Sequence, residues 1–374
     1  MTEHITVYAY NVLFGDAILV EVPDGGQKRF ILIDVGNVLA GEGGKDSPLL
    51  DALSDVAERT SGRVDLYVMT HEHLDHVQGL RYAADNGVTL RADHVWMTAS
   101  AAPDYYDTHE NARKKKLDLM EAVHAFAAVL GAEQVPPSLA AIFAMNLKTD
   151  DYVEHIRSQL AAEANVHYVH REQPLDGLHA FTEATFRLLA PEEDTSAYYG
   201  SRHAHLAQPA AAAASGAKSR PIPLPGVDAG AFYQLIDRMN TGLLDSLLAI
   251  DKAANDTSIV FEMSWRGRRL LFPGDAEQGS WRMMADKTDL QPVDLLKVGH
   301  HGSRNATPPP EILDLVLPPA RRDQAVALVS TCAHVYPGVP DEGVEALLEA
   351  RTSTIRRTTE ATPGKPLIVT IEEG

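Results

Sequence analysis

Short apolar runs, most of them ending in glycine, proline or a charged residue, recur along the chain. The first two, residues 5–22 and 29–35, predict a pair of strands joined by the turn Pro23-Asp24-Gly25-Gly26. Similar runs predict further strands at residues 64–69, 93–97, 166–169, 185–189, 258–263, 268–272, 293–298 and 325–331, and an edge strand at 367–372.

Between these runs, apolar residues return at three- and four-residue steps, which is the period of a helix that buries one face. Residues 46–58 follow this pattern, with Ser47-Pro48 as the helix start. The same period predicts helices at residues 75–84 and 341–351 and a helical insertion at about 104–164. The segment from about residue 195 to 230 is rich in Ala, Ser, Gly and Pro. Its apolar residues show no periodicity, so a long loop is predicted there.

The run at residues 64–69 leads into the segment Thr70-His71-Glu72-His73-Leu74-Asp75-His76. His71 and His73 are two residues apart at a strand end, so their side chains can point the same way and chelate one ion. Asp75 and His76 fall in the turn into the next helix, where they can face a second position close by. Zinc takes this mixture of imidazole and carboxylate ligands. The alternative is a solvated histidine-rich loop, but the spacing after an apolar strand favours metal binding.

Six segments along the chain, one of which is this histidine-rich segment, resemble the metallo-β-lactamase superfamily. They resemble in particular the hydrolase domain of ComEC-type competence proteins. They occur in the expected order and cover roughly residues 5–100 and 180–345. The segments are GDAILVEV (15–22), FILIDVGN (30–37), THEHLDH (70–76), NDTSIVFEM (255–263), LLFPGDAE (270–277) and LLKVGHHGS (295–303). The resemblance implies a four-layer αβ/βα sandwich, with two β-sheets face to face, helices outside, and one domain over residues 1–374.

The resemblance also implies a set of site residues. The expected metal ligands are His71, His73, Asp75, His76, Asp275 and His301. Asp275 would bridge two ions, and Asp34 would support the ligand loop without binding metal. One or two divalent ions are expected, zinc first and manganese as the second choice.

Two parts of this set stay open. Where many superfamily members carry a further histidine after a strand, this chain has Pro191, Glu192 and Glu193, so Glu193, or His203 or His205 further on, would have to complete the first metal position. His301 fits the ligand context better than His300, which would then face the substrate and act as a proton donor, with the two roles exchangeable. Ser303 and Arg304 are expected to grip a phosphate oxygen.

Composition limits the partners. The formal charge is −19, which disfavours attraction to long nucleic acids or an anionic membrane. Basic residues cluster at 113–116 and 351–357, and these two clusters could form one local basic stripe. The lone cysteine, Cys332, excludes a disulfide within the chain. No signal peptide and no run of about 18 apolar residues is present, so a cytoplasmic protein without a membrane segment is expected.

The predicted function is that of a metallohydrolase in which a metal-activated hydroxide, oriented by Asp75 and Asp275, attacks an ester-like centre. A phosphodiester is the first choice of substrate, either a small one, a nucleotide or a nucleic acid. Hydrolysis of a carboxylic ester, lactone or amide is the alternative within the same chemistry. A metal-binding regulatory protein without catalysis is the alternative of another class. The sequence indicates no oligomeric state.

Overall fold

The computed structural model describes residues 3–37, 47–114, 149–198, 252, 254–287, 290–332 and 339–374. Thirteen strands of this part form two sheets. The seven-stranded sheet has the order β13-β1-β2-β3-β4-β5-β6, and the six-stranded sheet has the order β12-β11-β10-β9-β8-β7. The strands are β1 (His4–Tyr10), β2 (Ala17–Asp24), β3 (Gln27–Val35), β4 (Arg63–Met69), β5 (Arg91–Thr98), β6 (Val166–Val169), β7 (Ala184–Ala190), β8 (Val260–Trp265), β9 (Arg268–Phe272), β10 (Leu295–Val298), β11 (Val326–Val329), β12 (Thr354–Arg357) and β13 (Pro366–Glu372).

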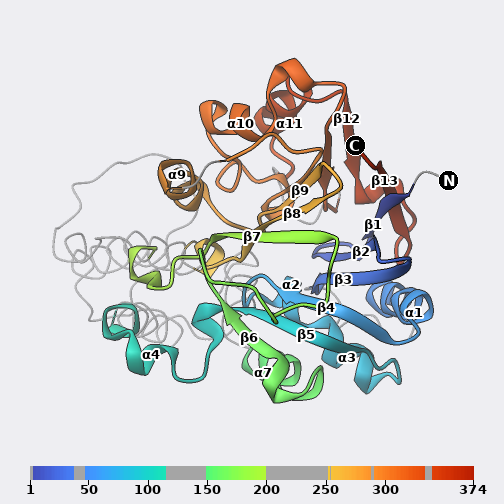
Figure 1. Cartoon of the computed structure of the whole chain (residues 1–374), viewed down its shortest axis with the longest axis vertical. Helices are drawn as coiled ribbons and strands as arrows, with labels where there is room; N and C mark the ends of the chain where they lie inside the picture. Colours follow the sequence, from blue (N-terminus) through green and yellow to red (C-terminus); the bar gives the residue numbers. More distant parts are fainter. Residues whose placement is uncertain are drawn as a thin grey trace, which may run out of the picture.

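Helices cover the outer face of each sheet (Figure 1). The α-helices described in full are α1 (Pro48–Thr60), α2 (Leu74–Val77), α3 (Gly79–Asp85), α4 (Tyr105–Thr108), α7 (Asp150–Gln159), α9 (Gln278–Lys287), α10 (Pro310–Val316) and α11 (Glu342–Glu349). Helices α1, α3 and α7 pack on the first sheet, and α9, α10 and α11 pack on the second. A third apolar core fills the space between the sheets. The expected αβ/βα sandwich is therefore confirmed.

Local sequence explains where two of the helices begin. The Ser47 side chain accepts a hydrogen bond from the Leu50 amide and caps α1, as predicted. Strand β13 lies at the edge of its sheet, also as predicted. Asp341 caps α11 by accepting from the amides of Gly343 and Val344.

Two predictions of elements were wrong, and three elements were not predicted. The single strand expected over residues 5–22 is two strands, β1 and β2, because the chain leaves the sheet at residues 11–16 and returns antiparallel to itself. The helix expected over 75–84 is divided into α2 and α3 at Gln78. The elements that were not predicted are helices α9 and α10 and strand β12.

The helical insertion is described only in part. Helices α4 and α7 lie within the expected range 104–164, but residues 115–148 fall outside the described residues. The long loop expected at 195–230 lies almost entirely outside them as well. The division of the chain into one domain with an insertion therefore stays a prediction.

Parallel pairing brings the chemistry to one edge of the sandwich. Strand β3 runs parallel to β4, and β9 runs parallel to β10, so within each pair the carboxyl ends lie side by side. Asp34 is at the end of β3, and the metal-binding segment follows β4. Asp275 follows β9 and the histidine pair follows β10. Among the described residues, no helix is both long and apolar enough to cross a membrane.

Candidate metal centre

Four buried side chains bring potential metal ligands together at the strand ends. Donor atoms of Asp75, His76, Asp275 and His301 all lie within 4.8 Å of one another. His76 Nε2 is 3.2 Å from Asp275 Oδ2, and His301 Nε2 is 3.1 Å from Asp75 Oδ2. Asp75 Oδ1 is buried, with no hydrogen-bond partner in the described part of the chain. Such a donor set and an unsatisfied buried carboxylate oxygen fit a divalent cation.

His71 and His73 lie beside this set, and we call these two residues the His71 flank. The His71 ring centroid lies 4.6 Å from that of His73 and 4.2 Å from that of His76. Both histidines are buried, and His71 Nε2 has no hydrogen-bond partner among the described residues. Neither histidine belongs to the four-residue set of close donors. The structure thus gathers all six predicted ligands in one region, but only four of them have donor atoms within 4.8 Å of one another.

Asp34 joins the ligand segment to the end of β3. Its Oδ1 accepts from the Thr70 amide at 2.8 Å, and its Oδ2 accepts from the Thr70 hydroxyl at 2.7 Å. The same Oδ2 lies 2.8 Å from Nδ1 of His76. A carboxylate at Nδ1 orients the ring and leaves Nε2 to face a metal. This geometry supports the predicted supporting role of Asp34.

The two neighbouring histidines after β10 occupy different environments. His301 is buried, and its Nδ1 lies 3.1 Å from the carbonyl of Ser330, so Nδ1 carries the proton and Nε2 is available as a ligand. His300 is partly exposed, and its backbone amide donates to Asp275 Oδ1 at 3.0 Å. Both residues have positive φ, 45° and 55°. Such angles are uncommon outside glycine and are found at strained functional loops.

Sequence reasoning missed two charged residues at the centre. Lys297, in the middle of β10, is 2% exposed and forms an ion pair with Asp16, which is also 2% exposed. Lys297 Nζ lies 3.9 Å from Asp275 Oδ1. The Asp16 amide donates to the Asp75 carbonyl at 3.1 Å and thereby supports the ligand loop. A lysine inside an apolar strand was the signal available in the sequence, since lysine is almost never fully buried without a partner.

Nearby charges and burial shift the pKa values of His76 and His71 in opposite directions. Burial alone would lower the pKa of His76, but the carboxylates of Asp275, Asp75 and Asp34 outweigh burial and hold it well above the ordinary value. Burial, together with His76 and His73, holds the pKa of His71 well below the ordinary value. His71 is therefore neutral, which is the form that binds metal.

The residues considered for the incomplete first position lie elsewhere or outside the description. The Glu192 carboxylate is paired with Arg171 at 2.7 Å and with Lys287 at 3.2 Å. Glu193 is not part of any close donor set among the described residues. His203 and His205 lie outside the described residues.

The predicted phosphate-binding residues are placed less directly. Ser303 Oγ accepts from the Ala306 amide at 3.3 Å and so closes its own loop. Arg304 is exposed, and its carbonyl accepts from the Gln278 side chain. Whether either side chain contacts a substrate stays a prediction.

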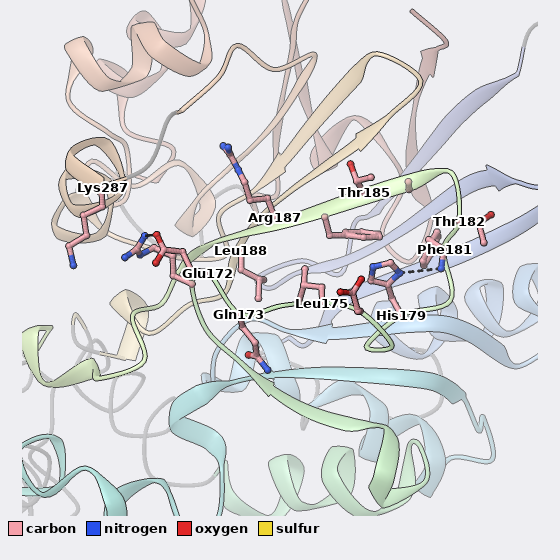
Figure 2. Close-up of a pocket in the computed structure, with 14 residues that line it drawn as sticks. Glu172, Gln173, Leu175, His179, Phe181, Thr182, Thr185, Arg187, Leu188 and Lys287 are labelled. Carbon is pink, nitrogen blue, oxygen red and sulfur yellow. Dashed lines mark hydrogen bonds and ion pairs between the residues drawn. The ribbon is translucent and has the colours of Figure 1, made fainter.

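A groove of about 680 Å³ lies away from this centre, between β7, the segment before β7 and α9 (Figure 2). Leu175, Phe181 and Leu188 supply apolar walls, and Lys287 lies at one end. None of the predicted ligands lines the groove. Its volume alone does not make it the reaction site, because it contains none of the converging acids and histidines found at the strand ends.

Comparison with known proteins gives little beyond overall shape. No family model matches the chain, and no curated protein matches it. Among solved structures it is similar to the metallo-beta-lactamase fold protein YhfI from Bacillus subtilis, with 9% sequence identity and a TM-score of 0.39 over 98% of this chain and 99% of that chain. Identity and TM-score this low leave the chemistry to be argued from the residues of the centre.

Proposed function

We propose that the protein is a metal-dependent hydrolase of the metallo-β-lactamase superfamily, of the ComEC-like type, and that it acts on a small phosphodiester. The proposal is carried by the buried donor set of Asp75, His76, Asp275 and His301, within 4.8 Å of one another. The order of sequence motifs supports the superfamily. Hydrolysis through activated water is the chemistry that a bound divalent ion, zinc or manganese, supplies in such a site.

In each of the two carboxylates, Asp75 and Asp275, the two oxygen atoms face different partners. Asp275 Oδ1 accepts from the His300 amide, which leaves Oδ2 on the side of His76. Asp75 presents Oδ2 to His301 and keeps Oδ1 without a partner among the described residues. Asp75 and Asp275 are thus positioned to hold and orient the attacking water. His71 and His73 would hold a second divalent ion beside the first, which would also activate water.

His300 is oriented by an amide. Asn255 Nδ2 lies 3.4 Å from Glu277 Oε1 and 3.5 Å from His300 Nδ1. An ionised carboxylate only accepts hydrogen bonds, so the amide nitrogen rather than its oxygen must face Glu277. The same NH₂ group then donates to His300 Nδ1, and the neutral ring carries its proton on Nε2. His300 can therefore donate a hydrogen bond to a phosphoryl oxygen or to the leaving group.

The experiment combines metal analysis with a substrate panel. Protein purified without chelator is assayed for bound metal and for hydrolysis of bis(p-nitrophenyl) phosphate, p-nitrophenyl acetate and a lactone. The proposal expects at least one divalent ion per chain and phosphodiester hydrolysis that chelator abolishes. Ester or lactone hydrolysis without phosphodiesterase activity would instead favour the alternative substrate class. Bound metal with no hydrolysis of any substrate would favour a regulatory role.

A double variant tests the ligand assignment directly. His76→Ala with Asp275→Ala removes two of the four close donors and should lose the ion held by that set, together with the activity. The matched control is His94→Ala with His167→Ala, because these two histidines also contact each other, at 3.4 Å, but lie on β5 and β6. Unchanged metal content in a folded His76→Ala/Asp275→Ala protein would overturn the assignment.

A further inference from the structure

The buried pair of Lys297 and Asp16 is not required by the proposed reaction. Lys297 lies in the four-residue strand β10, flanked by Leu296 and Val298, which are both buried. Burying an ammonium group is costly unless nearby anions compensate it. Three aspartates provide the compensation. Asp16 makes the direct ion pair, Asp275 Oδ1 lies 3.9 Å away, and Asp34 adds a longer-range attraction.

Asp16, the ion-pair partner of Lys297, belongs to a second group of possible metal ligands. Donor atoms of Asp16, Asp34 and His76 also lie within 4.8 Å of one another, and all three residues are buried. Asp16 Oδ1 has no hydrogen-bond partner in the described part of the chain. Without a cation on this side, the carboxylates of Asp16, Asp34 and Asp275 would face one another at low dielectric, which is strongly unfavourable.

We propose that Lys297 is a built-in cation that fills the Asp16 side of the centre and confines bound metal to Asp75, His76, Asp275 and His301 together with the His71 flank. This inference rests on the metal centre of the proposed function. It also explains how Asp275 is oriented. Lys297 and the His300 amide attract Oδ1, so Oδ2 is directed at His76 and the metal-binding side.

Counting bound ions in variants tests the inference. Wild-type protein, Lys297→Ala and Lys297→Arg are saturated with Zn²⁺, freed of excess ion and analysed for zinc per chain. Lys297→Ala should bind one ion more than wild type, because Asp16 and Oδ1 of Asp275 then lack their cation and can bind a divalent ion. Lys297→Arg keeps the positive charge and should bind the wild-type number. Lys297→Ala with Asp16→Asn removes a required ligand and should lose the extra ion.

If Lys297→Ala is unstable without metal, the thermal unfolding midpoint with and without Zn²⁺ provides a second measurement. A divalent ion that replaces the ammonium should raise the unfolding midpoint of Lys297→Ala by more than that of wild type at the same Zn²⁺ concentration. The inference is overturned if Lys297→Ala binds the wild-type number of ions and gains no additional stability from zinc. Absence of any ion in the wild type is a different result, since it would reject the proposed function while the comparison between variants still tests Lys297.

Discussion

Single side chains at this centre owe their behaviour to partners far away in sequence. Asp34 is 42 residues from His76, yet its carboxylate orients that imidazole and also receives both hydrogen bonds from Thr70. Asp275 is 199 residues from His76. Each of these contacts decides which atom of a ligand faces the metal.

Asp34→Asn should weaken metal binding without unfolding the protein. An amide keeps the size of the side chain but replaces one acceptor with a donor, so it cannot serve both Thr70 and His76. Loss of such a supporting contact typically lowers metal affinity about 10- to 100-fold. Competition with a chromophoric chelator measures this affinity.

The control for Asp34→Asn is Asp24→Asn. Asp24 is equally buried and accepts from the amides of Thr182 and Glu183, but it belongs to neither close donor set. Its replacement should lower stability and leave metal affinity unchanged. Equal metal affinity for wild type and Asp34→Asn would contradict the supporting role.

Asp256 carries a separate prediction about pH. Burial first, and then the nearby charge of Glu277, raise the pKa of Asp256 to about 6. Because the folded pKa is above the unfolded value of 3.8, the folded protein is favoured by protonation, and this contribution is lost as the pH rises from about 4 through about 6. A shift of roughly two units corresponds to about 3 kcal/mol.

Asp256→Asn should therefore stabilise the protein at pH 8 relative to wild type by up to about 3 kcal/mol, with little difference at pH 4. The asparagine oxygen can still accept from the Glu277 amide and from Ser280, as Asp256 Oδ1 does now. Urea unfolding of both proteins at a series of pH values measures the difference. A difference in stability that does not change with pH would contradict the prediction.

Among the secondary-structure elements, close backbone packing holds the ligand loop against the end of β3. A Cβ added at Gly36 would lie 2.2 Å from the Asp75 carbonyl carbon and 2.4 Å from the His76 nitrogen. Both contacts are with backbone, which cannot move without shifting the ligands. The glycine after β3 is therefore required by the approach of α2.

Gly36→Ala should destabilise the protein by more than about 3 kcal/mol and reduce metal occupancy, since overpacking against backbone has no low-energy relief. Gly26→Ala is the control. Its added Cβ would meet nothing within 4 Å, so only its positive φ of 81° costs stability, about 1–2 kcal/mol, and metal occupancy should not change. Calorimetry and elemental analysis of the two variants provide the comparison. Similar metal loss in both would argue against the close-packing explanation.

We expect His71 and His73 to form the weaker metal position, because the end of β7 carries no histidine to complete it. Pro191, Glu192 and Glu193 stand there, and the Glu192 carboxylate is held by Arg171 and Lys287. On dilution, zinc content should fall toward one ion per chain as the ion at His71 and His73 dissociates first. Elemental analysis after stepwise dilution measures this. Two ions of equal affinity would mean that Glu193, His203 or His205 completes the position.

At the scale of the whole molecule, the net charge is −19, and the two basic clusters of the sequence are local exceptions to it. Arg351, Arg356 and Arg357 each form an ion pair at 2.7 Å, with Asp314, Glu360 and Glu345. Arg113 lies 3.6 Å from Asp107. The described arginines of both basic clusters are thus each close to a carboxylate, and Lys115 and Lys116 lie outside the described residues.

We therefore expect a small phosphodiester to be hydrolysed faster than duplex or single-stranded DNA. Long-range repulsion between the acidic protein and a polyanion is screened as salt rises, so any activity on DNA should increase or stay level with added salt. Rates on bis(p-nitrophenyl) phosphate, duplex DNA and single-stranded DNA at about 20 to 500 mM salt provide the measurement, because the Debye length falls from roughly 20 Å to roughly 4 Å over this range. Efficient DNA cleavage that declines steeply with salt would show that a basic groove governs substrate choice.

Local sequence pattern by itself determined much of this protein. Apolar runs located β3, β4, β9 and most other strands, because strand periodicity is a short-range property. The histidine-rich segment after β4 indicated the metal chemistry. Short elements such as β12 and the break between α2 and α3 were missed, since a few residues carry too weak a periodic signal.

Tertiary structure alone decided which of those residues lie together and which atoms of each have partners. The sequence left the roles of His300 and His301 exchangeable. Their rings have different surroundings, which come from residues distant in sequence. Asp75 and Ser330 contact the buried ring of His301, and Asn255 lies near the ring of His300. The pairing of Lys297 with Asp16, across 281 residues, was likewise invisible in the local pattern. Charge compensation and close packing depend on distances in space, and a sequence pattern records only distances along the chain.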